Sequence, residues 1–120
     1  NLLFLSGHIP DEVAGKKTRG KVGSALTVDE GKEAARLTGI ALLTTLKSYV
    51  GDLNKVKRIV KVFGMVNADS TFTQHPAVIN GCSDFLVAVF GDKGRHARSA
   101  VGMGSLPFDA SVEIEMIVEL

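Results

Sequence analysis

The chain ends in Val112-Glu113-Ile114-Glu115-Met116-Ile117-Val118-Glu119-Leu120, where apolar and acidic residues alternate more regularly than anywhere else. Because successive side chains of a strand point to opposite faces of a sheet, this alternation predicts a strand. One face would belong to the core and the other would carry carboxylates. The expected core side chains are Val112, Ile114, Met116, Val118 and Leu120, and those of the opposite face are Glu113, Glu115, Ile117 and Glu119.

Two segments further upstream have the spacing of helices. Thr27-Val28-Asp29-Glu30 matches a capping box, in which a hydroxyl and a carboxylate satisfy free amide donors at a helix start. This helix should run for about six turns to Gly51, which suits a left-handed C-cap. A second helix is expected from Pro76 to Gly91. The expected core side chains are Ala35, Leu42, Leu46, Tyr49 and Val50 in the first helix, and Val78, Cys82, Phe85, Leu86, Val89 and Phe90 in the second.

Three other segments are expected to form strands. Asn1 to Ser6 is a short apolar run that should be buried on both faces or nearly so. Lys57 to Val66 is rich in Ile, Val and Phe and contains no Pro, which favours a central strand. Ser99 to Met103 can form a third strand, and Leu106-Pro107 then interrupts the chain. Residues 11–23, which are polar and rich in Gly, indicate a loop or a weak hairpin.

This order of elements predicts a two-layer α+β fold, with a mixed sheet and two helices on one face. The 120 residues suffice for a single domain, residues 1–120. The second face of such a sheet is open to water unless other subunits cover it, so we expect a homo-oligomer. Because residue 1 already lies in a strand-like run, we also expect the natural chain to extend further at its N-terminus.

The composition excludes several classes of protein. Apolar residues make up 45% and charged residues 22% of the chain, as in ordinary globular domains. The net charge of +1 provides no general attraction for nucleic acids or anionic membranes, and no apolar run is long enough to span a bilayer. Cys82 is the only cysteine, which excludes an internal disulfide and favours a reducing, cytoplasmic setting. The three histidines lack metal-ligand spacing, so no metal site is expected.

A basic cluster and an acidic residue suggest where chemistry takes place. Arg95, His96 and Arg98 stand just before one predicted strand and Glu113 opens the next, so an arginine could pair with a carboxylate across adjacent strands. Arginine can hold a carboxylate through two parallel hydrogen bonds, and Glu113 could transfer a proton to or from water. Alternatively, Arg98 and Glu113 form a structural ion pair. The residues alone leave the function open.

Both ends of the chain resemble one family. Leu3-Phe4-Leu5-Ser6-Gly7-His8-Ile9-Pro10 is similar to the opening strand and turn of the YjgF (Rid) family, with His8 replacing the usual glutamine. Ala97-Arg98-Ser99-Ala100-Val101, Leu106-Pro107 and Val112-Glu113-Ile114-Glu115 resemble its C-terminal signature at matching spacing. Ala100 stands where the family often has Cys, and Gly102 where an acidic residue is more usual. The chain therefore resembles a divergent subgroup of these imine and enamine deaminases, which are also called endoribonuclease L-PSP proteins.

The resemblance implies a chorismate-mutase-like fold and a homotrimer around a sheet-lined central barrel, with clefts between subunits. It implies that Arg98 holds the carboxylate of a 2-imino or 2-enamino acid and that Glu113 acts on the water or on the tautomerising carbon. The products would be a 2-keto acid and ammonia, without a metal or an organic cofactor. The remaining site residues implied are Ser6, Gly7, Asn80 and the backbone amide of Ala100.

Two other functions remain open. The chain could be a non-catalytic trimer that binds small carboxylate metabolites or other proteins. It could also act on RNA, because Lys16 to Lys21 and Lys55 to Lys61 are basic. Aromatic side chains that stack on bases are scarce, with one Tyr and no Trp, so nucleic acid is not expected as a partner.

Overall fold

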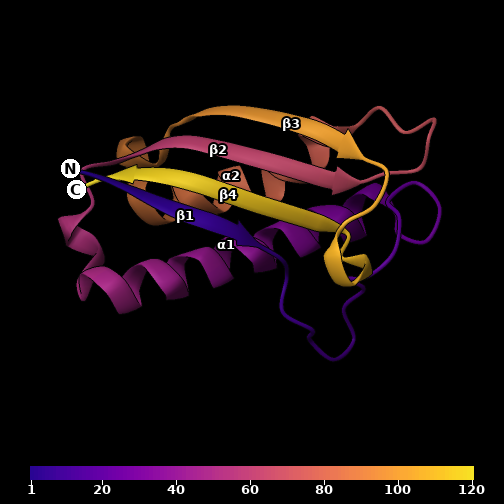
Figure 1. The fold of residues 1–120 in the computed structure, drawn as a ribbon, viewed down its shortest axis with the longest axis horizontal. Helices are drawn as coiled ribbons and strands as arrows, with labels where there is room; N and C mark the ends of the chain where they lie inside the picture. Colours follow the sequence, from indigo (N-terminus) through magenta and orange to yellow (C-terminus); the bar gives the residue numbers. More distant parts are fainter.

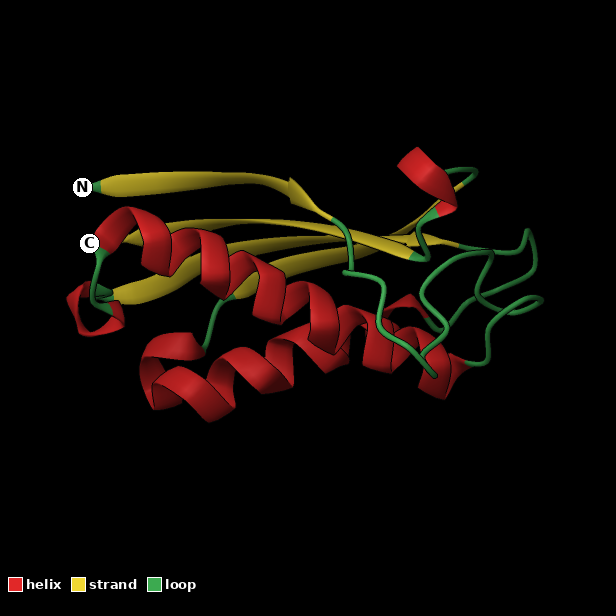
Figure 2. Cartoon of the chain, turned by 90° about the horizontal axis from the view of Figure 1, so that it is seen from below, coloured by secondary structure: helices red, strands yellow, loops and turns green.

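The structure is a computed structural model that describes residues 1–120. Two helices lie against one face of a four-stranded sheet, and the other face is uncovered (Figures 1 and 2). This arrangement confirms the predicted two-layer α+β fold with a mixed sheet. The elements are β1 (Leu2–His8), α1 (Val28–Val50), β2 (Arg58–Asn67), α2 (His75–Phe90), β3 (Ala97–Met103) and β4 (Val112–Glu119). Short 3-10 turns cover Leu53–Lys55, Gly91–Gly94 and Pro107–Asp109. Neither helix combines the length and the apolar character that crossing a membrane requires.

The strands lie in the order β1-β4-β2-β3 (Figure 1). β4 is antiparallel to both β1 and β2, whereas β3 is parallel to β2. β2 is therefore a central strand, as its composition predicts. β1 and β3 form the two edges of the sheet, and they carry different parts of the candidate site.

The core lies between the sheet and the helices. On β4, the side chains of Val112, Ile114, Met116 and Val118 are buried, which confirms the face predicted from the alternation. In α1, Leu42, Leu46 and Val50 are buried, but the expectation for Tyr49 is wrong, since it is 73% exposed. Val50 takes the core position at the end of this helix, and the neighbouring side chain points about 100° away, into solvent. Val89 of α2 is likewise exposed.

The first strand differs from its prediction. β1 is an edge strand in which Leu5 alone is buried, so the predicted burial on both faces is wrong for this chain. Leu2 and Phe4 are exposed because no layer covers the open side of the sheet. At the end of β1, His8 accepts a hydrogen bond from the Thr45 hydroxyl at 2.7 Å, which ties the strand to α1. In this tautomer its other ring nitrogen donates to the carbonyl oxygen of Ser6.

The start of α1 follows the predicted capping box. Thr27 N–H donates to the Glu30 carboxylate at 2.9 Å, and Glu30 N–H donates to the Thr27 hydroxyl at 3.1 Å. At the other end, α1 stops at Gly51 as predicted; its φ of 82° is positive, but its ψ of −47° lies outside the left-handed helical region that the prediction named. Residues 11–23 form an irregular segment with isolated bridges rather than a hairpin.

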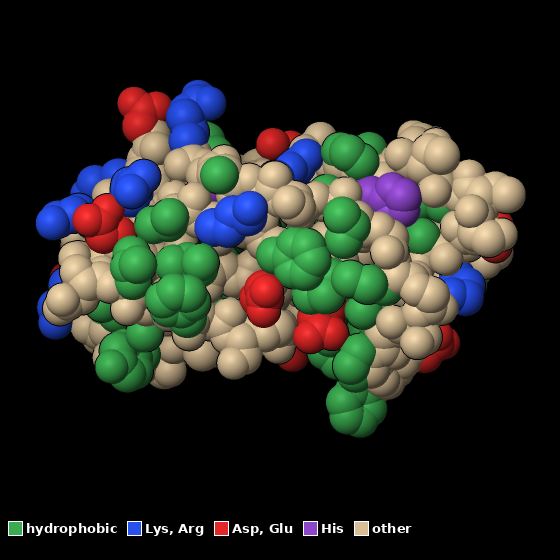
Figure 3. All heavy atoms as spheres, turned by 45° about the horizontal axis from the view of Figure 1, so that its top comes forward, with side chains coloured by type: hydrophobic (Ala, Val, Ile, Leu, Met, Phe, Trp, Pro, Cys, Tyr) green, Lys and Arg blue, Asp and Glu red, His purple; other side chains and the backbone are tan.

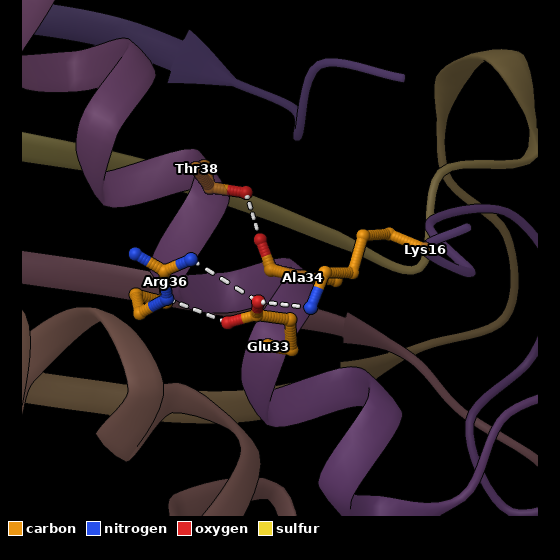
Figure 4. A network of polar contacts seen from close by, with 5 residues as sticks. All are labelled: Lys16, Glu33, Ala34, Arg36 and Thr38. Atoms are coloured by element: carbon orange, nitrogen blue, oxygen red, sulfur yellow. Dashed lines mark hydrogen bonds and ion pairs between the residues drawn. The ribbon is translucent and has the colours of Figure 1, made fainter. Parts of the chain in front are cut away.

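A cluster of charges fastens this segment to α1 (Figure 4). Glu33 accepts two hydrogen bonds from Arg36, at 2.6 and 3.1 Å, and forms an ion pair with Lys16 at 3.0 Å. One turn further along, the Thr38 hydroxyl donates to the Ala34 carbonyl oxygen. The Arg36 hydrogen bonds, and then that of Lys16, lower the pKa of Glu33 to about 2.

Glu33→Gln is expected to lower the free energy of unfolding at pH 7 by about 0.5 to 1 kcal/mol, because these pairs are partly screened by water. Since the pKa is lower in the folded chain, this stabilisation is present above the unfolded pKa and is lost as pH falls through about 2. Urea unfolding of the wild type and the variant at several pH values measures this difference in the free energy of unfolding. A difference between the two proteins that persists unchanged below pH 2 would contradict this account.

At Gly81, the backbone of α2 lies directly against the backbone of α1. A Cβ at this residue would overlap the carbonyl oxygen of Lys32 in α1 and lie 2.8 Å from its carbonyl carbon. Backbone atoms cannot turn aside as a flexible side chain can. The small residue is therefore needed for α2 to pack on α1.

Gly81→Ala is expected to lower the free energy of unfolding by about 2 to 3 kcal/mol, because the helices must move apart. The matched control is Gly104→Ala, since a Cβ at residue 104 meets no atom within 4 Å. Denaturant unfolding of both variants provides the measurement. Equal stability of the two variants would show that the helix crossing tolerates the added methyl group.

Candidate active site

Arg98 lies on the helix side of the edge strand β3. It is paired in register with Val62, whose side chain is fully buried beneath the helices. The guanidinium donates to the Ser83 hydroxyl at 3.0 Å and to the Pro76 carbonyl oxygen at 3.3 Å, both in α2. No ion pair of the structure includes Arg98. Its charge is thus held in place by neutral groups and is available to an anion.

Ser83 also contacts a histidine. The Gly94 carbonyl oxygen can only accept, so His96 Nδ1 donates to it, at 2.6 Å. Neutral His96 then has Nε2 as an acceptor, which lies 2.8 Å from the Ser83 hydroxyl. Burial lowers the pKa of His96, an effect that the Gly94 hydrogen bond opposes and the charge of Arg98 reinforces. The neutral form of His96 is therefore favoured at neutral pH.

Asn80 and Ala100 lie at the same edge of the molecule. Asn80 is four residues after Pro76 and three before Ser83, so it shares the α2 face that contacts Arg98. Ala100 follows Arg98 by two residues in β3 and therefore lies on the same side of the sheet. One group of predicted site residues is thus brought together by α2 and β3. It consists of Arg98, Asn80 and Ala100.

The other predicted site residues gather on the open face of the sheet. Glu113, near the start of β4, is in register with Met65. Its carboxylate occupies the space that a side chain at Gly7 would need, which explains why residue 7 has none. Ser6 is exposed beside them, and no ion pair includes Glu113. The second group therefore consists of Ser6, Gly7 and Glu113.

A hollow of about 310 Å³ lies next to this second group on the open face. Figure 3 shows hydrophobic side chains, with acidic and basic ones among them, over this side of the molecule. The hollow is lined by Phe4, Leu5, Ser6, Lys61, Phe63, Glu115, Met116 and Ile117.

The predicted contact between Arg98 and Glu113 is wrong, both as a site on adjacent strands and as a structural ion pair. β2 lies between β3 and β4, and the two side chains are on opposite sides of the sheet. The error arises because consecutive strands were expected to be neighbours in the sheet. β3 instead lies at the edge, parallel to β2, and β2 separates it from β4. Within one chain, the arginine and the glutamate cannot act on the same small molecule.

Two further residue types bear on cofactor binding. Burial raises the pKa of the Cys82 thiol to about 12, so this cysteine stays protonated, as its place in the helix stripe predicts. No group of three or more His, Cys, Asp or Glu side chains lies close enough to hold a metal ion.

Sequence reasoning missed Ser83, although a hydroxyl seven residues after Pro76 within an apolar helix is a signal that could have indicated it.

Comparison with known proteins gives matches over the whole chain. The family described as "YjgF/chorismate mutase-like, putative endoribonuclease" matches residues 1–120. Protein TCP17 of Trypanosoma cruzi is 44% identical over 119 residues, which are 98% of this chain and 74% of that protein.

Two solved structures have nearly the same fold. Protein Atu1372 of Agrobacterium tumefaciens, of unknown function, is 44% identical with a TM-score of 0.95, covering 100% of this chain and 76% of that one. A "putative endoribonuclease" of Shewanella oneidensis is 32% identical with a TM-score of 0.93, covering 99% and 79%. Because the family matches the whole chain and a 44% identical protein has the same fold, the chain belongs to the YjgF/chorismate mutase-like family, as its sequence signature predicts.

Proposed function

We propose that this protein hydrolyses 2-imino and 2-enamino acids to 2-keto acids and ammonia, in clefts between the subunits of a homotrimer. The observation that carries this proposal is the state of Arg98. Its guanidinium is fixed by a serine hydroxyl and a backbone carbonyl, and no carboxylate of the chain neutralises it. An arginine held in this way suits a small carboxylate, which it can bind through two parallel hydrogen bonds.

The reaction needs little further chemistry from the protein. A protonated imine carbon is already electrophilic, so orientation of the substrate through its carboxylate and removal of a proton from water can suffice. Glu113 takes a proton from the attacking water, whose oxygen bonds to the imine carbon. Glu113 passes this proton to the nitrogen of the resulting carbinolamine, the C–N bond breaks and ammonia leaves, while the hydroxyl oxygen loses its proton to Glu113 and forms the carbonyl bond. For an enamine, a proton first adds to the neighbouring carbon.

The proposal places Arg98 and Glu113 of one cleft in different subunits. Within a chain they lie on opposite sides of the sheet, so a partner must bring the open face of its sheet to the β3 edge. The exposed apolar side chains of that face, including Phe4 and Leu2, favour such association. The lone buried cysteine suits the cytoplasmic location that forms part of this proposal.

The direct test is release of ammonia from a 2-imino acid generated in situ by an amino-acid oxidase. Acceleration by the wild type over the uncatalysed rate is expected for several imino acids. A folded protein that binds pyruvate, a small 2-keto acid, but gives no acceleration would instead be a non-catalytic binder of carboxylates.

A second candidate function comes from the name of the Shewanella oneidensis relative, which is called an endoribonuclease. The near-neutral net charge of this chain does not favour RNA as a substrate. An RNA-directed protein would bind RNA with a steep dependence on salt concentration. RNA cleavage that survives Arg98→Ala and shows this dependence would favour the second candidate.

A further inference from the structure

Three consecutive hydrogen bonds end at the candidate carboxylate-binding arginine. They run from the Gly94 carbonyl oxygen to His96 at 2.6 Å, from His96 to the Ser83 hydroxyl at 2.8 Å, and from Ser83 to Arg98 at 3.0 Å. The first link lies just before β3, the second joins α2 to the residue that precedes β3, and the third joins α2 to β3. We call Gly94, His96, Ser83 and Arg98 the relay.

The position of each proton in the relay is determined by the group next to it. The Gly94 carbonyl oxygen only accepts and the Arg98 guanidinium only donates, so the two ends define the direction of the hydrogen bonds between them. His96 carries its proton on Nδ1, and Ser83 donates its hydroxyl proton to His96 Nε2. The oxygen of Ser83 is thereby left to accept from Arg98. Both ring nitrogens of His96 and the hydroxyl of Ser83 thus have partners, and their hydrogen bonds restrict the rotation of the arginine side chain.

Of the five N–H donors of Arg98, Ser83 takes one and the Pro76 carbonyl oxygen takes another. Three donors remain for a substrate. Because Pro76 and Ser83 lie on the same helix face, the two contacts fix both the position and the tilt of the guanidinium plane. A side chain with several rotatable bonds loses less entropy on binding a ligand when it is already held.

We infer that Ser83 and His96 are positioning residues, which hold the guanidinium of Arg98 ready for the substrate carboxylate through a neutral histidine. This inference rests on the proposed function, because it takes Arg98 as the group that binds the carboxylate. It deepens that function by assigning roles to two residues outside the Ala-Arg-Ser signature.

The charged groups around His96 leave Arg98 as its main electrostatic neighbour. On its own segment, Arg95 is exposed and paired with Asp92. On α2, Cys82 stays uncharged because of its raised pKa. On β2, Lys61 faces the opposite side of the sheet, where it lines the open hollow.

The first experiment measures pyruvate binding and steady-state kinetics of imine hydrolysis in four single variants and in the double variant Ser83→Ala, His96→Leu. Ser83→Ala and His96→Leu are each expected to raise the Kd of pyruvate and the KM about three- to tenfold, with a smaller change in kcat. The increases in Kd caused by the two substitutions should not add, since both interrupt the same series of hydrogen bonds. His96→Gln keeps an acceptor for Ser83 and should stay near the wild type. The control is Ser48→Ala, which removes an exposed hydroxyl that bonds only within α1.

The second experiment follows pyruvate binding as a function of pH. Protonated His96 has no acceptor for the Ser83 proton and places a second positive charge beside Arg98. The pKa of His96 is lowered, so wild-type affinity should be constant at neutral pH and fall only when pH drops below the usual histidine range. The His96→Gln variant has no such group and should show no fall. Identical profiles for both proteins would overturn the inference.

A third measurement tests the relay without any ligand. Nitrogen NMR of histidine-labelled protein at pH 7 should show His96 protonated on Nδ1 and not on Nε2. If the wild type neither binds pyruvate nor hydrolyses imines, the proposed function is wrong, and this tautomer alone then decides whether the relay exists. Protonation on Nε2, or unchanged pyruvate binding by Ser83→Ala in a protein that binds it, would contradict our inference.

Discussion

Replacing Arg98 with alanine is expected to lower kcat/KM for imino acid hydrolysis, and affinity for pyruvate, by about 10²- to 10⁴-fold. Two charge-assisted hydrogen bonds to a carboxylate account for a loss of this size. The loss should be large because Arg98 is the only cation of the relay, so no other residue of the relay can take over its charge. Ammonia release and calorimetry with pyruvate provide the two measurements.

The matched control for charge is Arg58→Ala, which removes an exposed arginine paired with Glu119 on β4. Its kinetics should stay within about twofold of the wild type, since surface pairs contribute little. Arg98→Lys keeps the charge but not the rigid fork, and should recover only part of the activity. If Arg98→Ala and Arg58→Ala have equal activity, Arg98 does not bind the substrate.

Replacing Glu113 with glutamine is expected to lower kcat by about 10²- to 10⁴-fold and to leave the Kd of pyruvate within about twofold. The amide matches the size of the carboxylate, so its packing against Gly7 is kept. It cannot accept a proton from the attacking water. Single-turnover ammonia release separates this chemical step from binding.

The matched control is Glu115→Gln, which changes the same group on the same strand and face, two residues further along. Its kcat should resemble that of the wild type. A Glu113→Gln variant with normal kcat would exclude proton transfer by this residue. The protein would then be better described as a binder of carboxylates.

The fold was predictable from local patterns because these patterns determine which side of each element is buried. The alternation in β4 predicts its core face, and the Thr27 to Glu30 capping box predicts the start of α1. Tyr49 was misplaced because two neighbouring residues at a helix end both fit an approximate stripe, and only packing selects Val50.

The order of the strands could not be predicted in the same way. Consecutive strands are often neighbours, but the chain passes from β3 across the end of β2 before it forms β4. That single step separates Arg98 from Glu113. The hydrogen bonds of Ser83 and His96 also escaped prediction, since they depend on how α2 lies against β3.

The central claim is that each active site combines Arg98 of one subunit with Glu113 of another. Co-expression of Arg98→Ala chains with Glu113→Gln chains tests it most directly, because some clefts of the mixed oligomers would then contain both intact residues. If the chains assort randomly, about one quarter of the clefts are intact, so mixed oligomers should recover about a quarter of wild-type activity. Mixed oligomers no more active than the two parent variants would contradict the claim.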